Sequence, residues 1–230
     1  WRPETNTFHF DFGEATMTLQ DVQVLFGLPI NGAAVVGVTV ELSPLQWREK
    51  CKNLLGFEPY VQDPSSWEIA GQWLNIGPLE RSCKTELQEG QPDIVYEQRA
   101  RALILWCIGS FIFPDHRADG VSLYWLQLLE DFDGIQGYSW GSALLAGVYR
   151  ALAISYEANQ KWLTNCVQLI QVWAWEHIPR IRPTMKKKSL FDTVPDCPLG
   201  GRWVGPRSKS NIATTLSAYR DQLTRLREDQ

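Results

Sequence analysis

The sequence of 230 residues predicts a mainly α-helical single domain with a small β-hairpin or sheet element near the N-terminus. Helix-starting and helix-ending residues recur from Ser43 to Pro179, and a short alternating stretch precedes residue 18. The chain also holds 11 tryptophans, and each such ring buries on the order of 150–250 Å². With 44% hydrophobic and 21% charged residues, the composition is globular and excludes a disordered, collagen-like or coiled-coil chain.

The first 40 residues form the β-containing element of this prediction. Residues 7–10 and 15–18 flank the sequence DFGE, which predicts a β-hairpin with Gly13 in its turn. Residues 35–40 are apolar and β-branched. We expect them to form a strand beside the hairpin.

Two helices have complete start signals. Thr18 with Asp21 is a variant of the capping box and opens a short helix through Leu25. The sequence SPLQ, starting at Ser43, places a cap residue, a first-turn proline and a third-position glutamine ahead of a helix to about Leu55.

The helical core is expected over residues 41–179. Its further predicted helices cover residues 65–74, 92–113, a stretch from Ser122, 140–157 and 164–177, while residues 77–91 read as a loop. The second half of 92–113 is apolar on every side, which is typical of a helix buried all round. Leu123, Leu126, Leu128 and Leu129 should point inward.

The C-terminal part is divided into a basic arm or loop, residues 180–210, and a helix, residues 211–230, capped by Asn211. From residue 178 onward the chain has 11 Lys and Arg against 5 Asp and Glu, a net charge of +6, whereas residues 1–177 carry −10. Such an arm can contact nucleic acid or an acidic partner, although a solvated face with a neutral helix is the preferred explanation. The candidate contact residues are Arg180, Arg182, Lys186, Lys187, Lys188, Arg202, Trp203, Arg207 and Lys209.

The five cysteines are widely spaced and contain no CxxC pair, which excludes a zinc ribbon and indicates a reducing compartment. The longest apolar run, residues 102–113, is too short to span a membrane. Because the chain begins with Trp1 and not with Met, we expect it to be part of a longer protein.

The candidate catalytic and metal-binding residues are few. Asp115, His116 and Asp119 could hold a metal, but they are also ordinary turn formers after a proline. Residues 137–141 match GxSxG, yet no strand precedes Ser139, so we expect it to cap a helix. His177 should close a helix, where a cation suits the helix dipole. No phosphate-binding glycine motif is present, and we expect no cofactor, no metal and no catalysis.

Most tryptophans are expected in the core, and Trp203 on the basic arm is the best candidate for contacting a partner. Five motifs in register then resemble the plant mobile domain family. They lie at residues 1–22 (WRPETNTFH and GEATMTLQDV), 27–32 (GLPING), 113–115 (FPD), 138–150 (YSWGSA through YR) and 173–179 (WAWEHIP).

This resemblance implies a non-enzymatic nuclear module acting in transposon silencing, control of gene expression, genome stability and meristem maintenance. It implies a phosphatase-7-like protein and other plant mobile domain proteins as partners. The alternative is a nucleic-acid-binding domain of transposon origin that uses the basic arm. A third reading, a hydrolase or transposase-derived enzyme, would need clustered carboxylates and metals that a helical domain does not offer.

Overall fold

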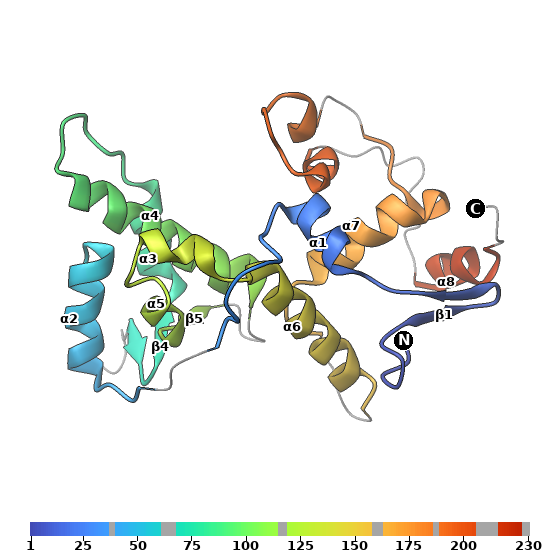
Figure 1. Ribbon diagram of the computed structural model, residues 1–230, viewed down its shortest axis with the longest axis horizontal. Helices are drawn as coiled ribbons and strands as arrows, with labels where there is room; N and C mark the ends of the chain where they lie inside the picture. The colour runs from blue at the N-terminus through green and yellow to red at the C-terminus, as the bar shows by residue number, and fades with distance from the viewer. Residues whose placement is uncertain are drawn as a thin grey trace. The chain divides into compact units, whose positions relative to one another are not determined.

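The computed structural model describes residues 1–36, 40–60, 68–114, 119–157, 163–185, 189–205 and 216–226. Helices dominate these ranges and two small antiparallel sheets accompany them, so the predicted fold class is confirmed (Figure 1). The chain forms two compact units. Unit 1 combines residues 1–32 with 139–230, and unit 2 comprises residues 33–138. The expectation of one domain over the whole chain stays a prediction.

Unit 1 begins with the predicted hairpin. Strands β1 (Phe8–Phe10) and β2 (Gly13–Ala15) pair antiparallel, with Phe8 opposite Ala15 and Phe10 opposite Gly13. Gly13 therefore lies in the strand and not in the turn, and its φ of 152° is one that side-chain-bearing residues rarely adopt. His9 faces solvent, as expected, and its Nε2 lies 3.2 Å from Glu14 Oε1.

Helix α1 (Leu19–Phe26) follows and has both predicted ends. Thr18 and Asp21 form a complete capping box, and Gly27 ends the helix with a φ of 69°. Val22 and Leu25 are its buried residues. Local hydrogen bonds thus fix the helix, and its apolar face directs it onto the rest of unit 1.

Helix α6 (Trp140–Ser155) packs at Gly141 against Val22 of α1 and against the segment that follows α1. The amide of Gly141 donates to the carbonyl of Pro29 over 2.8 Å. A Cβ at Gly141 would lie 2.9 Å from the Cγ2 of Ile30, closer than real side chains allow. Ser139 occupies the predicted N-cap position, but its hydroxyl donates to Ser142 Oγ instead of accepting from the backbone.

Unit 1 is completed by α7 (Val167–His177), by 3₁₀ turns at Pro179–Ile181, Leu190–Asp192 and Leu199–Trp203, and by α8 (Leu216–Thr224). Trp173 of α7 stacks on Phe8 with ring centroids 5.6 Å apart. In its described residues, the arm predicted over 180–210 contains these short 3₁₀ turns. Asn211, the expected cap of the last helix, lies outside the described residues.

In unit 2, α2 (Pro44–Leu55) has the predicted capping box between Ser43 and Gln46. It buries Trp47, Cys51 and Leu55 along one face. The backbone N–H of Ala33 donates to the carbonyl of Gly137 over 2.8 Å, so the two ends of unit 2 lie side by side. Val35 and Val36 are not in a strand, and the rest of the strand expected over 35–40 lies largely outside the described residues.

The helix expected over residues 65–74 is wrong in its described part. Strands β3 (Ile69–Ala70), β4 (Trp73–Asn75) and β5 (Gly120–Ser122) form an antiparallel sheet in that order. Leu74 is buried between exposed neighbours, which is the alternation of a strand, and it pairs with Val121. Ser122 therefore ends a strand, and the helix that follows, α5 (Tyr124–Gln127), is a single turn.

The loop expected over residues 77–91 is also partly wrong, because α3 (Ile76–Lys84) occupies its first half. The side chain of Asn75 caps it by accepting the Gly77 amide over 2.9 Å, and Pro78 and Leu79 are its buried residues. Helix α4 (Asp93–Cys107) begins where predicted and continues as a π-helix over Ile108–Ile112.

Helix α4 and its π-helical extension are not buried all round, contrary to the prediction. Leu103 and Phe111 are each 46% exposed. The buried side includes Gly109, where a Cβ would lie 2.6 Å from the Cβ of Val121, so glycine permits β5 to pack closely. The expected inward leucines 123, 126, 128 and 129 are all buried.

The five cysteines are all free. Burial raises the pKa of Cys51 to about 12 and that of Cys166 to about 11. None of the helices in the described ranges has the length and apolar character of a membrane span.

We expect Cys51 and Cys166 to resist alkylation in the native chain at pH 8, because the thiolate is the reactive form and burial suppresses it. Iodoacetamide labelling followed by peptide mass spectrometry measures each site, and the same reaction in guanidinium chloride gives the unprotected rates. Native labelling of Cys51 at its unfolded rate would contradict the packing of α2.

Candidate functional site

Unit 1 contains a groove with a volume of about 660 Å³, lined by the hairpin, α1, the end of α7 and the segment after it. Most of its lining is apolar, with Phe10 and Phe12 from the hairpin, Val24 from α1 and Trp173 from α7. Phe12 is 47% and Val24 46% exposed. Its volume and apolar lining are those of binding pockets, which span roughly 300–1,000 Å³.

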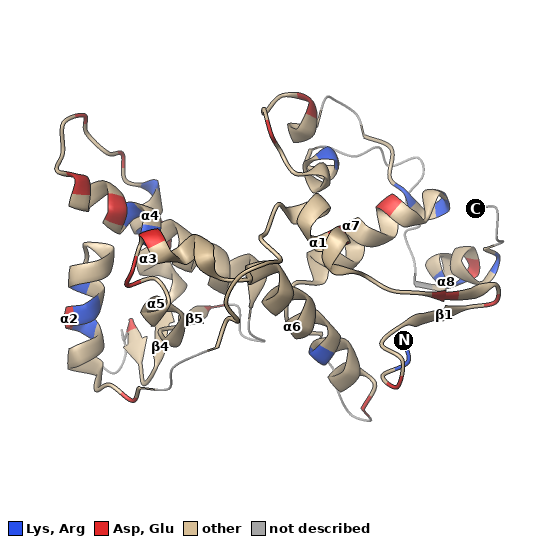
Figure 2. Ribbon diagram, viewed as in Figure 1, with Lys and Arg blue, Asp and Glu red and all other residues tan. Residues whose placement is uncertain are grey.

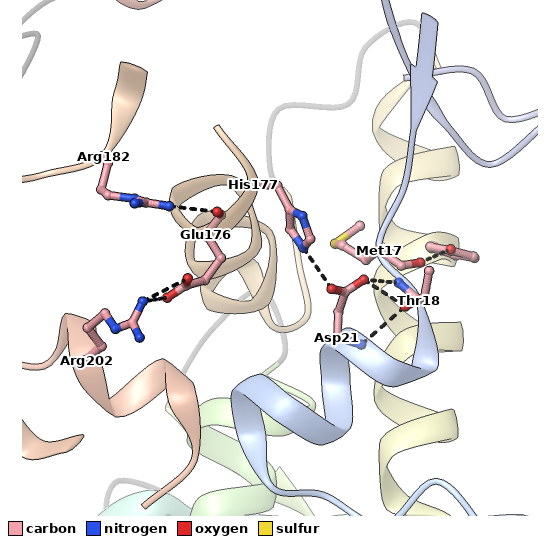
Figure 3. A network of polar contacts seen from close by, with 8 residues as sticks. Met17, Thr18, Asp21, Glu176, His177, Arg182 and Arg202 are labelled. Atoms are coloured by element: carbon pink, nitrogen blue, oxygen red, sulfur yellow. Dashed lines mark hydrogen bonds and ion pairs between the residues drawn. The ribbon is translucent and has the colours of Figure 1, made fainter. Parts of the chain in front are cut away.

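A polar pair lies in this groove. His177, the last residue of α7, places its Nε2 2.8 Å from Oδ1 of Asp21 in the first turn of α1 (Figure 3). The other carboxylate oxygen of Asp21 accepts from the amide and the hydroxyl of Thr18, both over 2.8 Å. The carboxylate of Asp21 also suits the dipole at the N-terminus of α1. His177 thus closes its helix, as the sequence predicted.

The tautomer of His177 follows from this geometry. An ionised carboxylate only accepts hydrogen bonds, so Nε2 carries the hydrogen, and the neutral ring then has Nδ1 as an acceptor. The side chain of His177 is 50% exposed, whereas that of Asp21 is 16% exposed. With a neutral ring, the pair therefore presents an accepting nitrogen beside a negative charge.

Glu176, the neighbouring residue, holds the C-terminal segment. Its carboxylate accepts from the Nε1 of Trp203 over 2.7 Å and lies 3.3 Å from Nη1 of Arg202. Arg182 donates to the carbonyl of Trp175 over 2.7 Å and to that of Glu176 over 2.8 Å, and so satisfies the end of α7. Figure 3 draws the contact with Glu176.

The structure corrects the view of Trp203 as an exposed contact residue. Its side chain belongs to the core at 5% exposure, and its ring lies 5.5 Å from that of Trp175. The ring needs a partner for its N–H when buried, and Glu176 supplies it.

The other described residues of the basic arm also have internal partners. Arg182 lies over the Trp203 ring, Arg202 lies over Phe191, and the exposed Arg180 donates to the carbonyl of Arg225 over 3.4 Å. Arg182 and Arg202 both contact Glu176, the first through its carbonyl and the second through its carboxylate. The remaining predicted contacts, Lys186, Lys187, Lys188, Arg207 and Lys209, lie outside the described residues.

Figure 2 shows basic positions close together on α2 of unit 2. Arg48 and Lys52 there pair with Glu58 over 2.8 and 2.6 Å. Hydrogen bonds from Lys52 and then Arg48 lower the pKa of Glu58. One carboxylate thus faces two cations, and such exposed ion pairs contribute little to stability.

The other residues that the sequence suggested as catalytic or metal-binding either have structural roles or lie outside the described residues. Ser139 is 6% exposed, and a 3₁₀ turn (Asp133–Gly137), not a strand, precedes it. Asp115 and His116 lie outside the described residues, and within those residues no group of three or more His, Cys, Asp and Glu side chains is arranged to hold a metal. Sequence reasoning missed the pairing of Asp21 with His177, which are 156 residues apart, because no local pattern links them.

The chain is thus mainly helical, and unit 1 has an apolar groove that contains the Asp21–His177 pair. The plant mobile domain family matches residues 1–230, and the chain belongs to this family.

Three relatives from Arabidopsis thaliana align with nearly all of the chain. It is 36% identical to "Serine/threonine-protein phosphatase 7 long form homolog" over 100% of the chain and 17% of that protein. It is 34% identical to "Protein MAIN-LIKE 2" and 33% identical to "Protein MAINTENANCE OF MERISTEMS", over 97% of the chain and 32% and 43% of those proteins. The chain therefore spans less than half the length of each. The comparison with solved structures found no match.

We expect Glu176→Ala to destabilise the protein by about 1–3 kcal/mol, because it leaves the buried Trp203 N–H without its acceptor. Chemical denaturation followed by tryptophan fluorescence measures the change in the free energy of unfolding. The matched control is Glu157→Ala at an exposed position, where a change within about 0.5 kcal/mol is expected. Equal effects of the two substitutions would contradict the role of Glu176.

Proposed function

We propose that this chain is the non-enzymatic interaction domain of a nuclear protein and that it binds a phosphatase-7-like protein. Through this complex it supports transposon silencing, control of gene expression and genome stability. The observation that carries the interaction role is the apolar groove of unit 1, with half-exposed Phe12 and Val24 in its lining. Exposed apolar surface gathered in a hollow is typical of binding sites.

The choice of partner is supported by the relative named as a phosphatase 7 long form homolog. A region 36% identical to the whole chain makes up 17% of that protein, so one polypeptide joins a domain of this kind to a much longer sequence. Joining two parts in one chain raises their effective concentration toward each other. We infer that the same two parts associate when they occur in separate chains.

The non-enzymatic role is supported by how the candidate reactive groups are used. Ser139 is buried beneath the start of α6, Glu176 holds Trp203, and Asp21 caps α1 while it binds His177. The position of each group is thus explained by burial or by a hydrogen bond within the protein.

We expect the purified chain to form a complex of equal stoichiometry with a purified phosphatase-7-like protein. Isothermal titration calorimetry should give a dissociation constant of about 1 µM or tighter, which corresponds to about −8 kcal/mol. A phosphatase catalytic domain of a different family serves as the control and should not bind. Separate elution of the two proteins in size-exclusion chromatography, with no heat of binding, would contradict the proposal. Imaging of the tagged full-length protein tests its nuclear location.

A second candidate function is nucleic-acid binding through the basic arm. The net charge of +6 from residue 178 onward favours it, and Arg180 is exposed. The pairing of Arg202 with Glu176 and of Arg182 with backbone carbonyls weakens it. Any such binding would depend on the five basic residues of the arm that lie outside the described ranges.

If this second function holds, replacing Lys186, Lys187 and Lys188 together by Ala should weaken binding to duplex DNA and flatten its salt dependence. Each lost phosphate contact reduces the log–log slope by about 0.9. A gel-shift titration at several salt concentrations measures both, with Lys52→Ala and Lys84→Ala together as a control outside the arm. Absence of any shift at low salt would exclude this function.

A further inference from the structure

The groove of unit 1 has two chemically different parts. Phe12 of the hairpin and Val24 of α1 supply half-exposed apolar surface. The Asp21–His177 pair adds hydrogen-bonding capacity, with the ring of His177 half exposed. An occupant that matches both parts needs apolar groups beside one polar group.

The charge of the groove selects the sign of that polar group. No Lys or Arg occurs among the described residues that line it. The carboxylate of Glu176 is matched by Arg202, whereas Asp21 faces His177, which adds no positive charge while its ring is neutral. While that ring is neutral, Asp21 is paired with no cationic side chain among the described residues, and in largely apolar surroundings its field is screened less than in water.

We propose that this groove binds a short peptide segment that carries large apolar side chains next to one Lys or Arg. The apolar side chains pack against Phe12 and Val24, and the cation donates to Nδ1 of His177 in the field of Asp21. This inference rests on the proposed function, because the segment belongs to the protein partner. An acidic segment or a nucleic acid would bring like charge toward Asp21, which costs free energy.

The first test selects the occupant without assuming its sequence. Random 12-residue peptides displayed on phage are enriched on the immobilised chain, and the selected sequences are read. We expect apolar residues flanking a Lys or Arg in the enriched peptides. Enrichment of peptides without a cation, or of acidic ones, would overturn the proposal, as would a failure to enrich any sequence.

The second test places the selected peptide in the groove. Fluorescence anisotropy should show at least a tenfold loss of affinity for Val24→Ser. The matched control is Val36→Ser in unit 2, which changes the same residue type at a position that is 69% exposed and outside the groove. Equal affinities of the two variants would overturn the assignment of the site.

The third test isolates the charge contact with a double-mutant cycle. Asp21→Asn in the chain and replacement of the peptide's cation by Gln should each weaken binding about tenfold, and together no more than either alone. Losses that multiply would show that the two groups do not interact. If Asn at position 21 disturbs the cap of α1, the same cycle with His177→Gln leaves Thr18 and Asp21 intact.

The same variants separate this inference from the proposed function. A phosphatase-7-like protein that binds the wild-type chain and Val24→Ser equally well would overturn the groove assignment and leave the proposed function standing. Failure of that protein to bind either chain would overturn the proposed function, while the peptide results would still decide what the groove accepts.

Discussion

The end of helix α7 is the point on which unit 1 depends. Its last two residues lie next to each other in sequence but point in different directions, as consecutive residues on a helix do. Glu176 accepts a hydrogen bond from Trp203 of the C-terminal segment. It also pairs with Arg202, while His177 pairs with Asp21 of α1 (Figure 3). Two segments that are remote in sequence are thus attached to one helix end. The groove exists because they are attached there, since its lining includes residues of both.

The sequence predicted best those elements whose ends are made by local hydrogen bonds. In the capping boxes at Thr18 and Ser43, the bonding partner is three residues further along the chain. The starts of both helices could therefore be predicted from the local sequence. Strand β4 could not, because Leu74 pairs both with Ile69 and with Val121, which lies far along the chain. The burial of helix α4 and its extension was predicted wrongly for a related reason. The sequence shows that Leu103 and Phe111 are apolar, but tertiary packing decides that both side chains remain exposed.

In the candidate site too, local features could be predicted from the sequence and distant contacts could not. Counting charges located the basic arm, yet a count cannot tell that Arg202 is matched by a carboxylate or that Arg182 is occupied by carbonyls. Trp203 likewise has no local pattern that distinguishes a core ring from an exposed one, and Trp175 and Glu176 bury it. For Asp21, the sequence predicts only the role in the capping box of α1. Its second role depends on a contact across 156 residues, which only the folded chain creates.

Unit 1 is assembled from two separate stretches, whereas unit 2 is one continuous stretch whose ends, Ala33 and Gly137, are joined by a hydrogen bond. This connectivity sets an order of events during synthesis. Residues 33–138 leave the ribosome as a complete set and can fold as soon as they emerge, since domains fold as units during translation. The hairpin and α1 are made before unit 2 but must wait for α7 and Trp203, and their apolar faces stay uncovered during that interval. Chaperone binding in that interval should therefore favour residues 1–32 over residues 33–138.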